Sequence, residues 1–153
     1  MLVVGKTVDK HLDALIADYV ARIGHFRPFS LEVIPELKAT KALTLLQQKE
    51  REGKLILDKL QAGDHVVLLD EHGREWRSVD WAAKLEKTFS QSMRRVVFII
   101  GGPYGFSDEV YAKATEKLSL SAMTFSHQMI RLLFVEQFYR AMTITAGIPY
   151  HHE

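Results

Sequence analysis

The chain has 153 residues, 47% of them hydrophobic, which is typical of one compact domain, and we expect a single domain over residues 1–153. The 20 Lys and Arg residues nearly balance the 19 Asp and Glu residues, which argues against nucleic-acid binding by overall charge alone. The absence of cysteine excludes disulfides and thiolate metal sites and fits a cytoplasmic protein, and no apolar run reaches the roughly 20 residues of a membrane span.

Predicted strands and helices alternate along the chain, which is typical of an α/β layer fold. The first 60 residues predict strands over 1–4 and 29–34 and helices over 12–23 and 43–60. The remainder predicts strands over 65–69, 96–100 and 118–120 and helices over 79–90, after 107 and after 126.

Local signals refine this outline. Ser78, Ser107 and Ser126 each stand where a side-chain oxygen could cap a following helix. The segment 70–73, Asp-Glu-His-Gly, predicts a turn. The segment 96–100 is apolar throughout, which predicts a strand buried on both faces in the middle of a parallel sheet.

Three predicted strand ends, at Leu69, Ile100 and Leu120, lead into loops rich in small or turn-forming residues. Ligands of open α/β sheets bind outside the carboxyl ends of the strands, so these ends predict a binding site. Gly101 and Gly102 would let a ligand approach the backbone closely. A tight strand-to-helix turn explains the glycines equally well, and the spacing matches neither the dinucleotide fingerprint nor the Walker motif.

The ionisable side chains predict no metal site, because none of the seven histidines forms an H-x-x-x-H pair and no cysteine assists. Asp70 and Glu71 could act as paired carboxylates of a hydrolase, although acidic residues before glycine more often form a solvated turn.

The C-terminal tail carries one aromatic ring and two imidazoles, at Tyr150, His151 and His152. It is either a frayed chain end or a flexible segment that closes over a site of its own chain or of a partner.

One combined pattern extends over nearly the whole chain, in the segments 68–70, 99–107, 118–127, Arg131, 136–141 and 149–151. Together these segments resemble the RlmH family, SPOUT-class methyltransferases that methylate N3 of a pseudouridine in 23S ribosomal RNA. Each motif alone is unspecific, whereas the combination is very specific. One difference is His152, since the family usually has Lys or Arg there and an imidazole is only partly charged near neutrality.

The resemblance implies an α/β fold with a C-terminal trefoil knot, a homodimer with cofactor sites near its interface, and S-adenosylmethionine as methyl donor. It places the cofactor contacts at Leu69, Gly101, Leu120, Ser121, Ala122, Met123, Thr124 and Phe125.

The tail residues Tyr150, His151 and His152 are the expected substrate contacts. The N3–H of the base must lose its proton, and His151 or His152 of the partner's tail is the candidate acceptor, ahead of His127. We hypothesise that no single residue is essential as the base.

The near-zero charge predicts weak binding of naked RNA and recognition of an assembled ribosomal surface by shape. Local basic patches would contribute through Arg22, Arg27, Arg74, Arg77, Arg94 and Arg95. A SPOUT methyltransferase for another RNA and a non-catalytic RNA-binding module remain alternatives.

Overall fold

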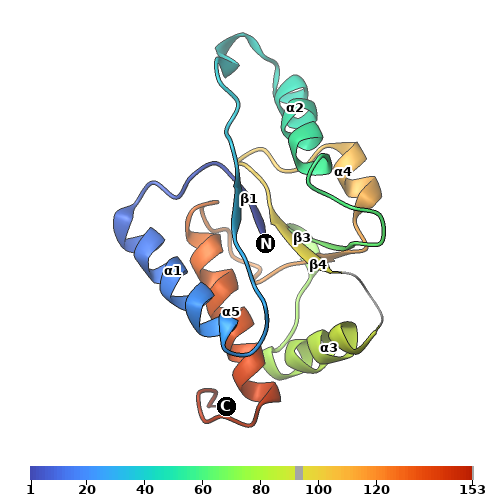
Figure 1. The fold of residues 1–153 in the computed structure, drawn as a ribbon. Helices are drawn as coiled ribbons and strands as arrows, with labels where there is room; N and C mark the ends of the chain where they lie inside the picture. Colours follow the sequence, from blue (N-terminus) through green and yellow to red (C-terminus); the bar gives the residue numbers. More distant parts are fainter. Residues whose placement is uncertain (92–94, 153) are drawn as a thin grey trace.

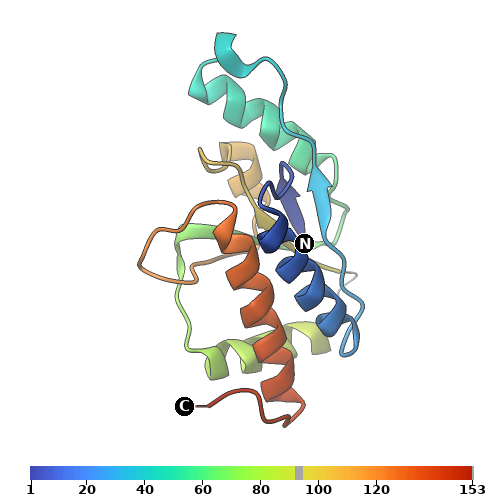
Figure 2. The ribbon, with the colours of Figure 1, turned by 90° about the vertical axis from the view of Figure 1, so that its left-hand side faces the viewer.

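The structure is a computed structural model that describes residues 1–91 and 95–152. Within these residues, one sheet of parallel strands has the order β2-β1-β4-β3-β5. The strands are β1 (Leu2–Val4), β2 (Glu32–Ile34), β3 (His65–Arg74), β4 (Val96–Ile100) and β5 (Glu116–Leu118). Helices lie on both faces of this sheet (Figures 1 and 2), which confirms the predicted α/β fold.

The helices form two outer layers. One layer consists of α1 (Lys10–Gly24), α3 (Ser78–Ser90) and α5 (Met129–Thr145), whose apolar side chains share one core cluster with the sheet. The second core cluster joins the other face of the sheet to α2 (Leu45–Leu57) and α4 (Asp108–Lys113). A short 3-10 turn, Thr40–Ala42, precedes α2. No helix of the described part of the chain is long and apolar enough to cross a membrane.

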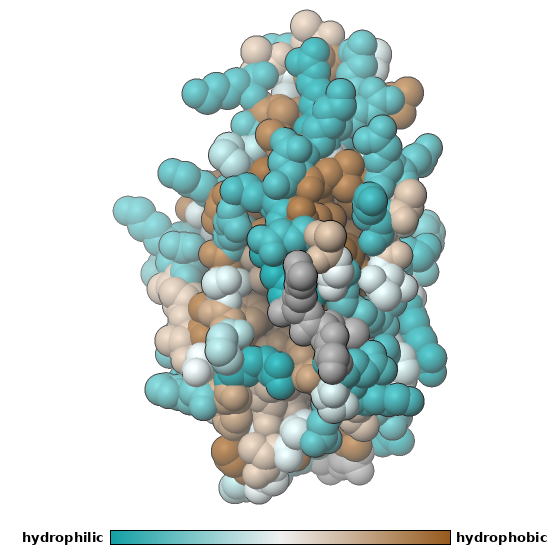
Figure 3. Space-filling view, turned by 45° about the vertical axis from the view of Figure 1, so that its right-hand side comes forward, coloured by the Kyte–Doolittle hydropathy of each residue, from teal (hydrophilic) through white to brown (hydrophobic). Residues whose placement is uncertain are grey.

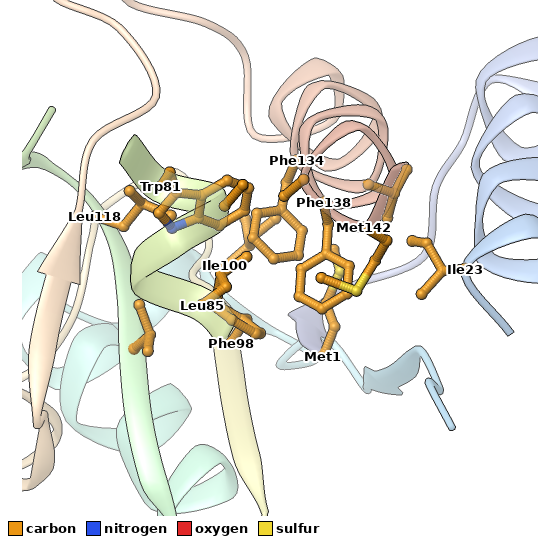
Figure 4. Close-up of a cluster of buried hydrophobic side chains, with 14 of the residues drawn as sticks. Met1, Ile23, Trp81, Leu85, Phe98, Ile100, Leu118, Phe134, Phe138 and Met142 are labelled. Atoms are coloured by element: carbon orange, nitrogen blue, oxygen red, sulfur yellow. The ribbon is translucent and has the colours of Figure 1, made fainter. Parts of the chain in front are cut away.

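Strand β4 lies at the centre of the sheet, as its apolar sequence predicts. Successive side chains of a strand point to opposite faces, so Phe98 and Ile100 enter the cluster with α5 while Val97 and Ile99 enter the other. Figure 4 shows Phe98 beside Phe134 of α5, and their ring centroids are 4.9 Å apart. Each such buried side chain contributes roughly 1.5–3 kcal/mol, so β4 holds both layers to the sheet.

The helix starts agree only in part with the predicted caps. The Ser107 side chain accepts a hydrogen bond from the Val110 backbone N–H and caps α4 as predicted. Ser78 is not a cap, because Arg77 holds the N-cap position and the Ser78 hydroxyl donates to Gln137 of α5 instead. Ser126 lies before the N-cap of α5, although its hydroxyl oxygen accepts from the Met129 N–H.

The predicted turn at 70–73 is wrong. Strand β3 continues to Arg74, which pairs with Leu118 of β5 after a register shift that begins beyond Leu69. The continuation depends on Gly73, because a Cβ there would lie 2.5 Å from the Leu118 backbone carbon. Strand β5 ends at Leu118 rather than at residue 120, because the chain leaves the sheet there.

Candidate functional site

A cleft of about 490 Å³ opens at the carboxyl ends of β4, β3 and β5. Its walls include Leu69 and the residues after it, residues 100–106, and residues 118–121 and 123–125. His127 and Ile130, near the start of α5, also line it. The three strand ends that the sequence singles out therefore lie around one cavity. Their convergence follows from parallel pairing, because parallel strands place their carboxyl ends at one edge of the sheet.

Seven of the eight residues that the resemblance assigns to the cofactor line this cleft: Leu69, Gly101, Leu120, Ser121, Met123, Thr124 and Phe125. Ala122 belongs to the same loop but does not line the cleft. Met123 and Phe125 are 74% and 39% exposed, so apolar side chains stand open to solvent at its rim. Exposed apolar side chains beside a concave site are typical of a surface that a ligand or partner covers.

The glycine segment forms one wall through its backbone. Gly105 has a φ of +78°, which L side chains rarely adopt, and its N–H donates to the Gly102 carbonyl at 3.3 Å. Phe106 turns back into the core, and a Cβ on Gly101 would lie 3.0 Å from its ring. A Cβ on Gly102 would lie 2.8 Å from the Glu52 carboxylate of α2. A side chain at either glycine would therefore crowd a neighbouring side chain.

The opposite loop holds its own shape through two hydrogen bonds. The Ser119 hydroxyl donates to the Ser121 carbonyl at 3.0 Å, and the Ser121 hydroxyl oxygen accepts from the Met123 N–H at 2.9 Å. The loop is also joined to β3, because the Ser119 N–H donates to the Arg74 carbonyl at 3.1 Å. These bonds fix the loop that follows β5 before any ligand arrives.

Several ionisable residues contribute to the cleft. The Tyr111 hydroxyl donates to the Asp70 carboxylate, and burial together with this bond raises the pKa of Tyr111 to about 12. The other Asp70 oxygen accepts from the His72 N–H. Lys49 of α2 and Glu71 also line the cleft. Lys49 and Tyr111 carried no sequence signal, because they lie in helices outside the strand-end loops.

Burial also raises the pKa of Glu52, whose carboxylate accepts from the Gln48 amide behind the glycine segment. Within the described residues, no group of three or more His, Asp or Glu side chains could hold a metal ion.

A fully buried arginine connects the start of α5 to the end of β1. Arg131 is 0% exposed and donates to the carbonyls of Val4, Gly5 and His127 and to the Thr7 hydroxyl. Burial lowers the pKa of its guanidinium. The acceptors are neutral oxygens at the carboxyl edge of the sheet, so this side chain fixes His127 beside the cleft.

The tail lies at the far end of α5. This helix has 17 residues, so its start at the cleft and its end are about 25 Å apart (Figure 2). The Tyr150 hydroxyl donates to Glu136 at 3.1 Å and lies 3.2 Å from the Tyr19 hydroxyl. Burial raises the pKa of Tyr150. None of Tyr150, His151 and His152 lines the cleft of its own chain; Tyr150 contacts α1 and α5, His151 lies beside α5, and His152 is exposed.

His151 sits on its own chain with one ring nitrogen unpaired. Its Nδ1 lies 3.4 Å from the Arg140 guanidinium, which Glu136 holds at 2.6 Å. Its Nε2 is buried without a hydrogen-bond partner among the described residues. An unsatisfied buried polar atom costs roughly 1–3 kcal/mol, so this resting position of the ring is not an optimal one.

The arginines of the predicted basic patches differ in their surroundings. Arg95 pairs with Asp64 and Arg22 pairs with Asp18. Arg27 stacks on Phe89, and Arg74 stacks on Trp76. Arg94 lies outside the described residues.

A parallel α/β sheet with a ligand-sized cleft at its strand ends defines a protein that binds a small molecule or cofactor at that edge. The sequence matches the family described as "Predicted SPOUT methyltransferase" over residues 1–151, and the chain belongs to this family.

Its relatives share the whole chain. A Bacteroides fragilis protein named Ribosomal RNA large subunit methyltransferase H is 63% identical over all 153 residues, which cover 98% of that protein. Proteins of the same name from Phocaeicola vulgatus and Flavobacterium johnsoniae are 62% and 50% identical, again over all 153 residues and 98% of their length.

Proposed function

We propose that this chain transfers a methyl group from S-adenosylmethionine to N3 of a pseudouridine in 23S ribosomal RNA, on the assembled ribosome in the cytoplasm. One observation carries the proposal: residues assigned to the cofactor by family resemblance line one preformed cleft. The name of the relatives, at up to 63% identity over the full chain, supports ribosomal RNA as the substrate. The family supports methyl transfer as the reaction.

The residues around the cleft fit the proposed cofactor. Its volume of about 490 Å³ lies within the roughly 300–1,000 Å³ of small-molecule sites. Leu69, Leu120 and Phe125 offer apolar walls for the adenine, and the Gly101 backbone allows close approach. Asp70 and Glu71 would stabilise the cationic end of the cofactor, whose chemical contribution when bound is an electrophilic methyl group on sulfur.

The protein's own contribution is binding, orientation and removal of a proton. Correct orientation alone can contribute roughly 7–11 kcal/mol to lowering the barrier. The base N3–H must be deprotonated, for which a positioned acceptor adds about 10²–10⁴-fold. We assign this role to His151 or His152, with Tyr150 beside them as a substrate contact and without one essential base.

The distance between tail and cleft supports a homodimer. Tyr150 and His151 rest on Glu136 and Arg140, about 10–17 Å along α5 from its start, and no tail residue lines the cleft of the same chain, so a tail acting on substrate would come from a second copy. The unpaired Nε2 of His151 supports a tail that gains contacts when it leaves its resting position.

We also propose a C-terminal trefoil knot, on the family resemblance. An experimentally determined structure would test it through the path of the C-terminal half of the chain.

Calorimetry with S-adenosylmethionine tests the cofactor site. Thr124 is exposed and lines the cleft, so Thr124→Trp should fill it and weaken binding at least tenfold. Ala112→Trp, at an exposed position of α4 outside the cleft, should bind as the unmodified protein does. Binding that is absent from the unmodified protein, or equal in the two variants, would contradict the site. Ribosome binding without cofactor binding would indicate the non-catalytic module instead.

A further inference from the structure

A second hollow, of about 620 Å³, lies on the surface between the end of β3 and α3. We call it the Arg74–Lys87 groove, and it is lined by Arg74, Glu75, Trp76, Arg77, Asp80, Ala83, Lys84 and Lys87. Four of these side chains are cationic and two are anionic, so the groove is locally positive on a chain whose net charge is only +1. Figure 3 shows hydrophilic side chains over much of one face of the molecule, with hydrophobic patches between them.

The groove contains a planar stacked pair. The Arg74 guanidinium carbon lies 3.7 Å from the centroid of the Trp76 ring, and Arg74 is exposed while Trp76 is half-buried. The guanidinium carbon lies over the indole in a cation–π contact, and the Arg74 side chain is accessible to solvent. A flat, positively charged face is suited to stacking with an unpaired nucleobase.

The cations of α3 extend this platform along one helix face. Asp80, Lys84 and Lys87 are spaced by four and three residues and therefore share a side of the helix. Lys84 is partly neutralised by Glu116 at 3.3 Å, whereas Lys87 is exposed. The groove thus places ammonium groups about one to three helical turns from the stacked pair, as a nucleic-acid backbone would require.

Strands β3 and β5 link the groove to the cleft through their backbone pairing. Arg74 pairs with Leu118, and Leu118 lines the cofactor cleft. The Ser119 N–H donates to the Arg74 carbonyl, so the loop of the cleft is joined to β3 at the residue that carries the platform. The groove and the proposed site of methyl transfer therefore lie beside the same pair of strands.

We propose that the Arg74–Lys87 groove binds a single-stranded RNA segment flanking the target nucleotide, with one base stacked on Arg74 and phosphates beside Lys84 and Lys87. The proposal rests on the proposed function for the identity of the RNA. An acidic protein surface would suit the lysines, but it would make no use of the stacked Arg74–Trp76 face.

The test measures methylation and binding of purified ribosomes by the full-length protein. Arg74→Ala should raise the KM for ribosomes about 5- to 100-fold, the range of one lost base stack, with kcat and cofactor affinity unchanged. The KM of Arg74→Lys should lie between those of the unmodified protein and Arg74→Ala, because lysine keeps the charge but lacks the planar face. Lys87→Ala should lower the salt dependence of ribosome binding by about one unit of slope. The matched control is Arg51→Ala, an exposed arginine of α2 outside the groove.

Equal KM values for Arg74→Ala and Arg51→Ala would overturn the proposal. So would a photo-crosslinking side chain at position 87 that attaches to a ribosomal protein, whereas attachment to 23S RNA would support it. Ribosome cosedimentation of the variants is a readout that does not need catalysis. Failure of the methyltransferase assignment would therefore be seen separately, as loss of cofactor binding by the unmodified protein.

Discussion

The regions at the two ends of helix α5 differ in how fully their polar groups are hydrogen-bonded. At its start, the loops after three parallel strands surround a cleft, and the loop after β5 is held in shape by its own hydrogen bonds. At its end, the tail rests on Glu136 and Arg140 and leaves a ring nitrogen of His151 unpaired. The parallel pairing of the strands brings the three loops of the first arrangement together. In the second arrangement, one polar atom has no hydrogen-bond partner among the described residues.

The largest effect should follow from deleting residues 150–153. The deletion removes every candidate proton acceptor of the tail, so we expect single-turnover methylation of ribosomes to fall about 10²–10⁴-fold. The unmodified cleft should still bind S-adenosylmethionine, because no tail residue of the same chain lines it. His151→Ala and His152→Ala should each have smaller effects, and a loss well beyond 10⁴-fold for one of them would disprove the absence of an essential base.

Mixed dimers test whether the tail acts at the cleft of its own chain or at the cleft of its partner. Thr124→Trp, with a filled cleft, would be coexpressed with the tail-deleted chain, and the dimer carrying one of each would be purified. The proposal predicts that this dimer recovers activity, because its one intact cleft faces the one intact tail. An inactive mixed dimer, or a monomer of 17.5 kDa by light scattering, would contradict it.

Arg131→Met tests how the cleft end of α5 is held. The change leaves the carbonyls of Val4, Gly5 and His127 without their buried donor, and each stranded acceptor costs roughly 1–3 kcal/mol. We expect the free energy of unfolding to fall by about 3 kcal/mol or more in urea denaturation. Arg22→Met, which removes an exposed pair with Asp18 and keeps an aliphatic side chain beside the Tyr19 and Tyr139 rings, should leave the free energy of unfolding nearly unchanged. Similar decreases in the free energy of unfolding for the two variants would show that Arg131 does not hold the cleft end of α5.

Gly73→Ala tests the junction of β3 with the loop of the cleft. A Cβ there would lie 2.5 Å from the Leu118 carbon and 2.6 Å from the Ser119 nitrogen, so backbone must move. Such crowding typically costs about 1–3 kcal/mol and should also weaken cofactor binding. Gly24→Ala is the matched control, since nothing lies within 4 Å of its added carbon. A melting temperature for Gly73→Ala as high as that of the control would show that the junction tolerates a side chain.

The smallest effect concerns Glu52, whose pKa burial raises above its ordinary value of 4.5. The folded state thus favours the protonated form, and this stabilisation is complete below pH 4.5 and is lost as the pH rises through the raised pKa. Glu52→Gln keeps an acceptor for Gln48 and removes the charge, so it should raise the melting temperature by a few degrees at pH 8 and have no effect at pH 4. A lower melting temperature of Glu52→Gln at pH 8 would show that the ionised carboxylate stabilises the fold, which contradicts the prediction.

The sequence predicted those features that depend on periodicity. The apolar segment 96–100 indicated a central strand, and the three strand ends indicated the edge that carries the cleft. It failed where tertiary contacts override local preference. Gly73 permits close pairing with β5 where its neighbours predict a turn, and the Ser78 hydroxyl bonds to Gln137 rather than to its own helix.

Other parts of the site carried no local signal at all. Lys49 reaches the cleft from α2, and the bonds of Arg131 to the Val4 and Gly5 carbonyls span more than 120 residues of the chain. The resting position of the tail on Tyr19 likewise depends on a contact across 131 residues. Spacing rules cannot find such contacts, because they describe neighbours along the chain.

The central claim is that the cleft serves methyl transfer to ribosomal RNA, and mass spectrometry of 23S RNA tests it most directly. Ribosomes from a strain that lacks the gene would be incubated with the purified protein and isotope-labelled S-adenosylmethionine. We expect one labelled methyl group per 23S RNA, on N3 of a single pseudouridine, present with Ala112→Trp and strongly reduced with Thr124→Trp. Unlabelled RNA, or equal labelling of a free RNA hairpin and of ribosomes, would contradict the account.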